Sequence, residues 1–404
     1  MKAGISVMNR RSLMQAGAAA ALAGALPARL ARAAGAPIPL GTLTPLTGAG
    51  GPYGPSMRKA MEWVAGEVNK AGGVLGRELK LYSEDGETNP DAAVRAARKL
   101  IDVDKVAAVM GTWASAVTTA VAPLCWESKT FLTTVSGSDT ITKLPHHGYL
   151  VRTQPNTVLQ MTGLARFVGG LGAKTLFVMS VQAPFAAPTH RILGEELPKH
   201  GCKLAGTLTY DKDKASYRSE VDEALRAKPD MIYLNGYTPD TIVLLKDLYK
   251  SGYDGKRIAQ AYAVNAKLLA SLPHEVTDGI YTIAPSPDVG SASYNRLAKV
   301  LGTQDLDPYS CQCHDHVSLV ALAIAKAGEA SGTAIRDNIR KISQGSGTKV
   351  DSAVEGLKLL AAGKEINYEG VSGPCDFTDI GDIRDTKFRY EQAENGKFKL
   401  VKIA

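Results

Sequence analysis

The chain has 404 residues and a formal net charge of +7, from 47 Lys and Arg against 40 Asp and Glu. Hydrophobic residues make up 45% and charged residues 22%, an ordinary globular composition that excludes a disordered chain. The length allows two or three domains with cores of their own. The basic balance suggests nucleic acid or an anionic membrane as a partner, so the location of the charges matters.

The first 33 residues have the composition of an export signal. They contain five basic residues and no acid, and Arg10 and Arg11 lie in a segment that resembles a twin-arginine signal. An Ala- and Leu-rich stretch, residues 13–28, follows and is too short to span a membrane, which takes about 20 residues. Ala31-Arg32-Ala33 then fits a signal peptidase site.

We therefore expect residues 1–33 to be an export signal, with Met1 or Met8 as the start. The alternative is a disordered or amphipathic extension. Without this segment the chain keeps only two of its seven net positive charges. The remaining Lys and Arg are dispersed, which predicts no nucleic-acid binding. The export signal predicts a periplasmic location.

Strand and helix patterns alternate along the rest of the chain. Short runs rich in β-branched residues predict strands at 38–43, 79–83, 106–110, 131–135, 175–181, 204–210, 231–234 and 280–283. Helical spacing or capping signals predict helices near Met57, after Asn89-Pro90, from Ser115, at 239–250, and at 291–301, 315–328 and 333–343. A β-like segment, residues 387–403, ends the chain. This order predicts an α/β fold of two doubly wound parallel-sheet lobes, with ligands bound beyond the carboxyl ends of the strands.

Motifs for catalysis are mostly missing. The glycine-rich segment 48–54 follows a strand, but Tyr53 stands where the third glycine of a dinucleotide fingerprint belongs. The sequence contains no P-loop and no nucleophile elbow, and His274-Glu275 lacks the second His of a zinc helix. We therefore predict a protein that is not an enzyme and has no cofactor.

One cluster, Cys311-Gln312-Cys313-His314-Asp315-His316, leaves an alternative open. Zinc accepts Cys and His, so Cys311, Cys313 and His314 could serve a metal-dependent exported enzyme. Adjacent residues rarely converge on one tetrahedral ion, however, and we favour a helix start with a disulfide from Cys375 to Cys311 or Cys313. The five cysteines leave at least one thiol unpaired within the chain.

Further motifs extend over nearly all of the chain after the signal. They include Pro45-Leu46-Thr47-Gly48, Tyr53-Gly54, 69–77 (NKAGGVLGR), Asp85, Gly111, Ser115, 134–138 (TVSGS), Asn235-Gly236-Tyr237, Asp278-Gly279, Gly370, Gly373, Phe377 and Gly381-Asp382. In these motifs the chain resembles the leucine/isoleucine/valine-binding type of periplasmic solute-binding proteins.

The resemblance implies a type I periplasmic binding protein fold whose two lobes are joined by a three-crossing hinge. It implies lobe 1 at 36–157 plus 286–365, and lobe 2 at 158–285 plus 366–404. It also implies a monomeric receptor for a small carboxylate-bearing ligand, either a branched-chain or other amino acid or an aromatic or organic acid. The partner would be the membrane permease of an ABC importer.

Two segments of the first lobe match the family's carboxylate site. Ser115 begins a predicted helix after a strand, where a hydroxyl and free N–H groups suit an anion. By resemblance Ser115 grips the ligand carboxylate, while Ser136, Gly137 and Ser138 form the strand-end loop beside it. Small residues in such a loop let the backbone approach a ligand closely.

Aromatic residues match the remaining walls. Tyr53 matches a lid position, Phe185 and Tyr237 follow second-lobe strands, and Trp113 is a further wall candidate. Amino-acid-binding members carry an acid for the α-ammonium where this chain has Tyr262, and Asp139 is the nearest other acid by sequence. This departure suggests a ligand without an ammonium group, such as an aromatic acid.

Overall fold

The computed structural model describes residues 35–404, and the predicted export signal at 1–33 lies outside the described residues. The strands of this part form a five-stranded, a seven-stranded and a three-stranded sheet. No helix in the same part is both long enough and apolar enough to cross a bilayer.

The five-stranded sheet is parallel throughout, in the order β2-β1-β3-β4-β5. Its strands are β1 (Ile38–Thr44), β2 (Leu79–Asp85), β3 (Ala108–Thr112), β4 (Phe131–Thr134) and β5 (Leu150–Arg152). The intervening helices are α2 (Gly54–Lys70), α3 (Pro90–Arg98), the π-helical turn η1 (Lys99–Val103) and α4 (Ser115–Glu127). Helix α3 begins as predicted, because the Asn89 side chain accepts hydrogen bonds from the N–H groups of Asp91 and Ala92.

The seven-stranded sheet has the order β15-β14-β10-β9-β8-β6-β7. Its parallel strands are β6 (Thr175–Val181), β7 (Lys203–Tyr210), β8 (Met231–Asn235), β9 (Lys256–Gln260) and β10 (Tyr281–Pro285). The last two strands, β14 (Phe388–Glu394) and β15 (Lys397–Ile403), pair antiparallel at one edge. The helices along this sheet are α5 (Thr157–Gly170), α6 (Ala186–Glu196), the short η2 (Leu197–His200), α7 (Arg218–Arg226), α8 (Thr238–Lys250), α9 (Ala266–Ser271) and α10 (His274–Thr277).

Alternate side chains of this sheet enter two separate cores. Leu176 and Val178 of β6 pack with residues of α5 and α6, whereas Phe177 and Met179 pack with residues of α7 and α8. Both faces are therefore covered, which explains why the strands read as continuous apolar runs.

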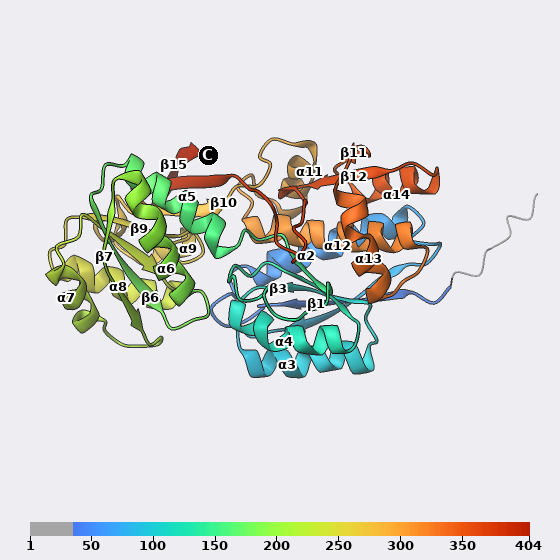
Figure 1. The fold of residues 1–404 in the computed structure, drawn as a ribbon, viewed down its shortest axis with the longest axis horizontal. Helices are drawn as coiled ribbons and strands as arrows, with labels where there is room; N and C mark the ends of the chain where they lie inside the picture. Colours follow the sequence, from blue (N-terminus) through green and yellow to red (C-terminus); the bar gives the residue numbers. More distant parts are fainter. Residues whose placement is uncertain (1–34) are drawn as a thin grey trace, which may run out of the picture. The chain divides into compact units, whose positions relative to one another are not determined.

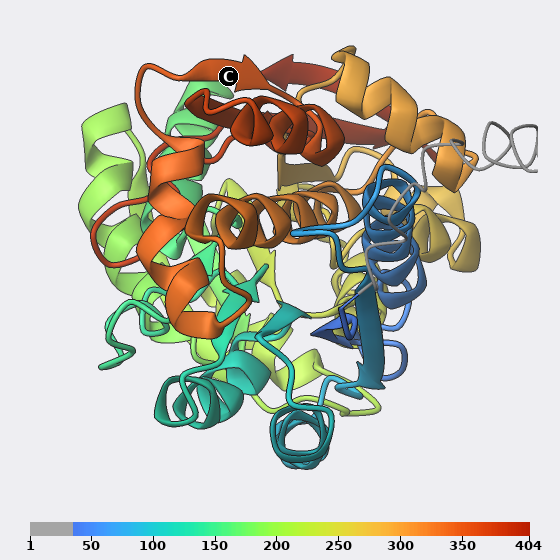
Figure 2. The same cartoon turned by 90° about the vertical axis from the view of Figure 1, so that its right-hand side faces the viewer.

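The remaining elements return to the first sheet. They are α11 (Ala292–Leu301), α12 (Pro308–Ala327), α13 (Gly332–Ser343), α14 (Ala353–Ala361) and the small sheet of β11 (Thr348–Val350), β12 (Ile366–Gly370) and β13 (Gly373–Pro374). Figure 1 shows α3 and α4 on one side of the first sheet and α2, α12 and α13 on the other. In Figure 2, α12 runs between α2 and α13.

Helix α12 starts earlier than the predicted residue 315. Asp307 caps it by accepting a hydrogen bond from the N–H of Ser310, and Pro308 occupies its first turn. The first two turns of α12 are buried on all sides, like most of the helix. The sequence therefore shows no amphipathic pattern that would mark where the helix begins.

The protein is thus an α/β molecule of two doubly wound lobes, with three passes of the chain between the two large sheets. The passes follow β5, β10 and β13. The predicted lobe boundary at residue 365 falls inside the first core, where Tyr368, Phe377 and Ile383 pack with residues of the first sheet. We propose that the third pass ends near residue 387, directly before β14.

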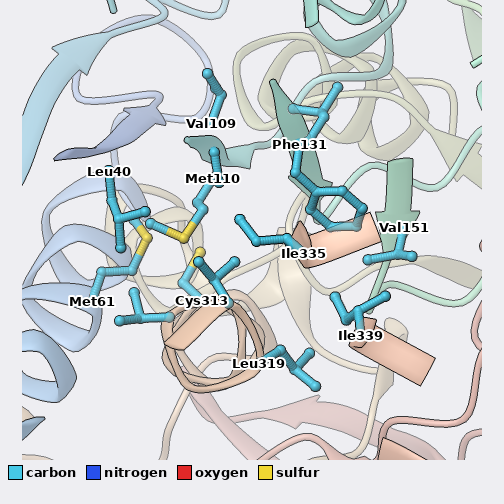
Figure 3. Packing of buried hydrophobic residues seen from close by; sticks show 14 of the residues in the cluster. Leu40, Met61, Val109, Met110, Phe131, Val151, Cys313, Leu319, Ile335 and Ile339 are labelled. Carbon is cyan, nitrogen blue, oxygen red and sulfur yellow. The ribbon is translucent and has the colours of Figure 1, made fainter. Parts of the chain in front are cut away.

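The first core also contains Cys313. In Figure 3 its sulfur lies beside Met61 and Met110, with Leu40 close by. All five cysteines are buried free thiols, so the predicted disulfide of Cys375 is wrong. Burial raises the pKa of the Cys125 thiol to about 12 and also raises the pKa of Cys313, which makes both groups poor nucleophiles and poor metal ligands.

Candidate ligand-binding site

A cavity lies where the carboxyl ends of strands from both large sheets meet. Seven of the nine predicted site residues line it: Trp113, Ser115, Gly137, Ser138, Phe185, Tyr237 and Tyr262. The other lining residues are Ala114, Val135, Gln154, Thr157, Gln160, Met161, Thr189, Tyr233, Asn235, Gln260 and Tyr309.

Aromatic rings from both lobes meet around Trp113. The Trp113 ring lies 5.7 Å from the centroid of Tyr237, and 5.8 Å from those of Tyr262 and Tyr309, both edge-on. Phe185 packs edge-on against Tyr237 at 6.1 Å. Trp113 and Tyr309 belong to the first lobe and the other three to the second, so the structure holds the lobes in contact at the site.

The first-lobe end of the cavity contains the start of α4. The residue before this helix is Ala114, whose side chain cannot cap the helix, so no cap side chain competes for the first-turn N–H groups. The Ser115 hydroxyl accepts a hydrogen bond of 3.3 Å from the N–H of Ser138 and joins the two predicted segments. A hydroxyl beside free helical N–H groups can bind a carboxylate.

The second-lobe wall ends in a buried hydrogen-bond chain. The Gln260 amide donates to the Tyr233 hydroxyl at 2.9 Å, and that hydroxyl donates to the Asn235 side chain at 3.1 Å. Asn235 in turn donates to Ser180, whose hydroxyl is 2.9 Å from His190. Because each of these groups has a hydrogen-bond partner, the network fixes the orientation of the Asn235 and Gln260 amides, which line the cavity.

Ser136 does not line the cavity. Its hydroxyl donates to the carbonyl of Trp113 at 2.8 Å and lies 2.6 Å from the hydroxyl of Thr118. These buried contacts hold the strand-end loop against α4, so Ser136 positions its neighbours Gly137 and Ser138.

Tyr53 lies behind the first cavity, where its ring stacks on Trp113 at 6.0 Å. Its hydroxyl donates to the carbonyl of Tyr262 at 3.3 Å and accepts from the Asn265 amide at 3.2 Å. Tyr53 therefore contacts the second lobe directly, and it lines a neighbouring cavity instead.

No Asp, Glu, His, Lys or Arg is among the residues that line the first cavity. Asp139 is buried outside it, where one carboxylate oxygen accepts from the N–H of Val158 at 3.4 Å and the other has no partner. Burial raises the pKa of the Tyr237 and Tyr262 hydroxyls, which keeps both neutral. The cavity therefore offers aromatic faces, hydroxyls and amides in a neutral lining.

Sequence reasoning missed the residues that the hinge and α12 bring to the cavity. Gln154 lies in the first crossing, and its side chain accepts a hydrogen bond from Gln312 of α12 at 2.8 Å. Thr157 and Gln160 follow on the first turns of α5. The Asp307-Pro308 helix start carries Tyr309 and is a recognisable signal, but it does not indicate that this helix reaches the cleft.

The cysteine–histidine cluster does not form a metal centre. Cys313 packs in the first core and Cys311 in a separate core beside Tyr294 and Leu297. His314 lies 2.9 Å from the carboxylate of Asp315 and packs on Trp63. Among residues 35–404, no group of three Cys, His, Asp or Glu side chains is placed to hold a metal ion.

The fold and the cleft are those of a protein class that closes two α/β lobes on a solute. The model of the family described as "Periplasmic binding protein" matches residues 37–381, so the chain belongs to this family. The chemotactic signal transduction system substrate-binding protein BasB of Halobacterium salinarum is 26% identical over 357 residues, which cover 85% of this chain and 84% of that protein.

Solved structures share the fold at lower identity. The branched-chain amino acid transporter substrate-binding protein LivJ of Streptococcus pneumoniae, in complex with isoleucine, superposes with a TM-score of 0.75 at 19% identity, covering 90% of this chain and 99% of LivJ. An ABC transporter solute-binding protein of R. palustris, in complex with 4-hydroxybenzoate, superposes with a TM-score of 0.74 at 17% identity. This superposition covers 91% of the present chain and 96% of the R. palustris chain. These superpositions show that the chain has the type I periplasmic binding fold, and at such low identities they show the fold alone.

Proposed function

We propose that this protein is an exported receptor for a small organic acid without an α-ammonium group, with aromatic acids as the first candidates. The observation that carries the proposal is the neutral, aromatic lining of the cavity between the lobes. After export, the receptor would deliver this solute as a monomer to the permease of an ABC importer.

The start of α4 supports binding of the carboxylate. Uncapped N–H groups and the Ser115 hydroxyl face a site that is otherwise neutral, so the helix end supplies the positive potential. The rings of Trp113 and Tyr237 can then stack on a planar ligand. The amides of Asn235 and Gln260 remain for a polar substituent such as a hydroxyl.

An α-amino acid fits this lining less well. Its ammonium group would lose water and find no carboxylate among the residues of the cavity. The desolvation of an unpaired charge is expensive, so an α-amino acid should bind more weakly than an acid of the same size that lacks the ammonium. The neighbouring structures contain either ligand class, isoleucine or 4-hydroxybenzoate, and the lining of this chain favours the second.

Closure of the lobes would form the surface that the permease recognises. The passes between the sheets give the hinge, and the Tyr53–Tyr262 hydrogen bond gives a contact of the closed form. Nothing in the site favours catalysis by Cys311, Cys313 and His314, because their side chains do not converge.

Calorimetry with the purified protein tests the proposal. We expect benzoate and 4-hydroxybenzoate to bind with micromolar or lower Kd, and leucine and isoleucine to bind at least a hundredfold more weakly. Mass spectrometry of the solute released on denaturation gives an independent identification. Tight binding of leucine, with no binding of either aromatic acid, would overturn the proposal.

A further inference from the structure

A second cavity adjoins the first. The two cavities share Gln260, Tyr262 and Tyr309 as lining residues, and Tyr53 lines only the second. The second cavity continues to the end of β10 and to the segment before α12. These three side chains therefore separate the two cavities, and a ligand that occupies both would have to displace or pass between them.

The second cavity differs from the first in charge. Its lining contains three carboxylates, Asp305, Asp307 and Glu391, and one cation, Arg389. Arg389 is already bound by two of the acids, at 2.7 Å from Asp305 and 2.5 Å from Glu391. One carboxylate, that of Asp307, is left over.

Asp307 is partly buried and has no cationic partner. Its oxygens accept hydrogen bonds from neutral groups: the N–H of Ser310 at 2.9 Å, the hydroxyl of Ser310, the hydroxyl of Ser56 at 3.2 Å, and the N–H of Tyr309. No Lys, Arg or His in residues 35–404 forms an ion pair with it. Burial raises the pKa of Asp307, as expected for a desolvated carboxylate, and the hydrogen bonds from Ser310 oppose that rise.

Aromatic faces surround the same space. The rings of Tyr53 and Tyr309 pack edge-on, with centroids 5.3 Å apart and an interplanar angle of 72°, and Tyr262 lines the cavity beside them. An unpaired carboxylate among tyrosine rings is the chemistry that binds organic ammonium groups, by charge attraction and by cation–π contact. A metal ion would find too few oxygen ligands here, whereas an alkylammonium uses the rings as well.

We propose that the second cavity binds an organic ammonium group, and that this group is the far end of an elongated ligand whose carboxylate lies in the first cavity. The position of the carboxylate rests on the proposed function. The neutral first cavity gives a cation no partner, and Asp307 gives it one on the other side of the shared tyrosines. The ligand class would then be acids with a distant amine.

Calorimetry with matched ligands tests the inference. The probes are the ω-amino acids from 4-aminobutanoate to 8-aminooctanoate, each against its parent alkanoate, and tetramethylammonium alone. For at least one length we expect the ω-amino acid to bind the wild-type chain ten times more tightly than its parent. Tetramethylammonium alone should bind weakly, since it lacks the carboxylate.

The variant Asp307→Asn removes the charge and keeps the helix cap, because Asn caps helices as well as Asp does. In this variant the ω-amino acid should lose most of its tighter binding relative to the parent alkanoate. The affinity for the parent alkanoates should stay within twofold of the wild-type value. The control Asp91→Asn changes an exposed acid in the first turn of α3 by the same charge and should leave both affinities unchanged.

The outcomes separate the two proposals. If alkanoates and benzoate bind but the amine gives no advantage at any length, and tetramethylammonium does not bind, the ammonium site is refuted and the acid receptor stands. If no acid binds but tetramethylammonium binds in an Asp307-dependent way, the ammonium site stands and the acid receptor falls. If tetramethylammonium and an alkanoate bind together while no ω-amino acid gains affinity, the cavity binds a separate cation and the single elongated ligand is wrong.

Discussion

Arg152 donates through its Nε to a carboxylate oxygen of Asp382 at 2.6 Å, and this buried ion pair joins the end of β5, where the first pass begins, to the third pass between the lobes. The same guanidinium donates to the carbonyl of Ser138 at 2.7 Å and to the hydroxyl of Thr142 at 3.1 Å. Burial lowers the pKa of Arg152, and Asp382 opposes that effect. The hinge and the ligand-site loop therefore share one charged group.

The variant Asp382→Ala should lower the free energy of unfolding by about 3–5 kcal/mol, because it leaves a buried guanidinium without its counter-ion. The double variant Arg152→Met, Asp382→Leu should recover part of this loss, since no buried charge then remains. Urea unfolding of the three chains measures both effects. A loss below about 1 kcal/mol for Asp382→Ala would contradict the role of the pair.

The variant Ser115→Ala should weaken binding of the carboxylate ligand. A hydrogen bond to a charged group contributes about 1.5–3 kcal/mol, so the affinity should fall roughly 10- to 100-fold. The control Ser128→Ala changes a hydroxyl at the other end of α4, which bonds the carbonyl of Leu124. Calorimetry on both variants and the wild-type chain measures the effect. If Ser115→Ala binds the ligand as tightly as the wild-type chain does, Ser115 does not bind the carboxylate.

The variant Tyr53→Phe removes the hydroxyl that reaches Tyr262 and Asn265 and keeps the ring that stacks on Trp113. A net hydrogen bond contributes about 0.5–1.5 kcal/mol, so we expect affinity to fall about 2- to 12-fold, mainly through faster release. Stopped-flow release kinetics measures this. Tyr249→Phe, at an exposed tyrosine, is the control. An unchanged release rate would show that the contact does not stabilise the closed form.

His316 should make stability depend on pH. It is fully buried, its Nε2 lies 2.9 Å from the Thr153 hydroxyl, and burial lowers its pKa from 6.5 to about 3. The unfolded chain binds the extra proton first, so stability falls as pH drops below 6.5 and continues to fall until about pH 3.

From pH 7 to pH 5 this histidine alone should remove about 2 kcal/mol. His146 and His190 have lowered pKa values for the same reason, burial, and add losses in the same direction. The measurement is therefore the difference between the wild-type chain and His316→Gln in urea unfolding at both pH values. Parallel pH profiles would contradict the assignment to His316.

The thiols give a chemical check of the fold. The five free cysteines are buried, so a thiol reagent should label none of them rapidly in the native protein and all five after denaturation without reductant. Mass spectrometry counts the labels. Three labels would indicate a disulfide and contradict the structure.

Sequence patterns predicted the sheets well, because buried parallel strands are short β-branched runs between capped helices. The second-lobe strand at 175–181 has the predicted bounds. Strand β9 was not predicted, because its first residues Lys256 and Arg257 interrupt the apolar run. Helix α12 was predicted too short, because its first turns are polar in sequence yet buried in the fold.

The site could be predicted where residues follow a strand directly, as Ser115, Ser138 and Tyr237 do. The contributions of Gln154 and Tyr309 could not, because they depend on where the hinge and α12 return to the cleft. The exclusion of Ser136 from the lining also depends on three dimensions, since only its hydrogen bonds to Trp113 and Thr118 show which way it points.

One helix, α12, connects several properties of this protein. Tyr309 on its first turn lines both cavities, while Gln312 and His316 hold Gln154 and Thr153 of the first pass. Side chains of this single helix thus contribute both to ligand preference and to the stiffness of the hinge. When a homologue evolves to bind a different ligand, the effects of substitutions at these α12 positions should depend strongly on one another. A new ligand specificity should therefore evolve more readily through substitutions in the second-lobe wall of the cavity.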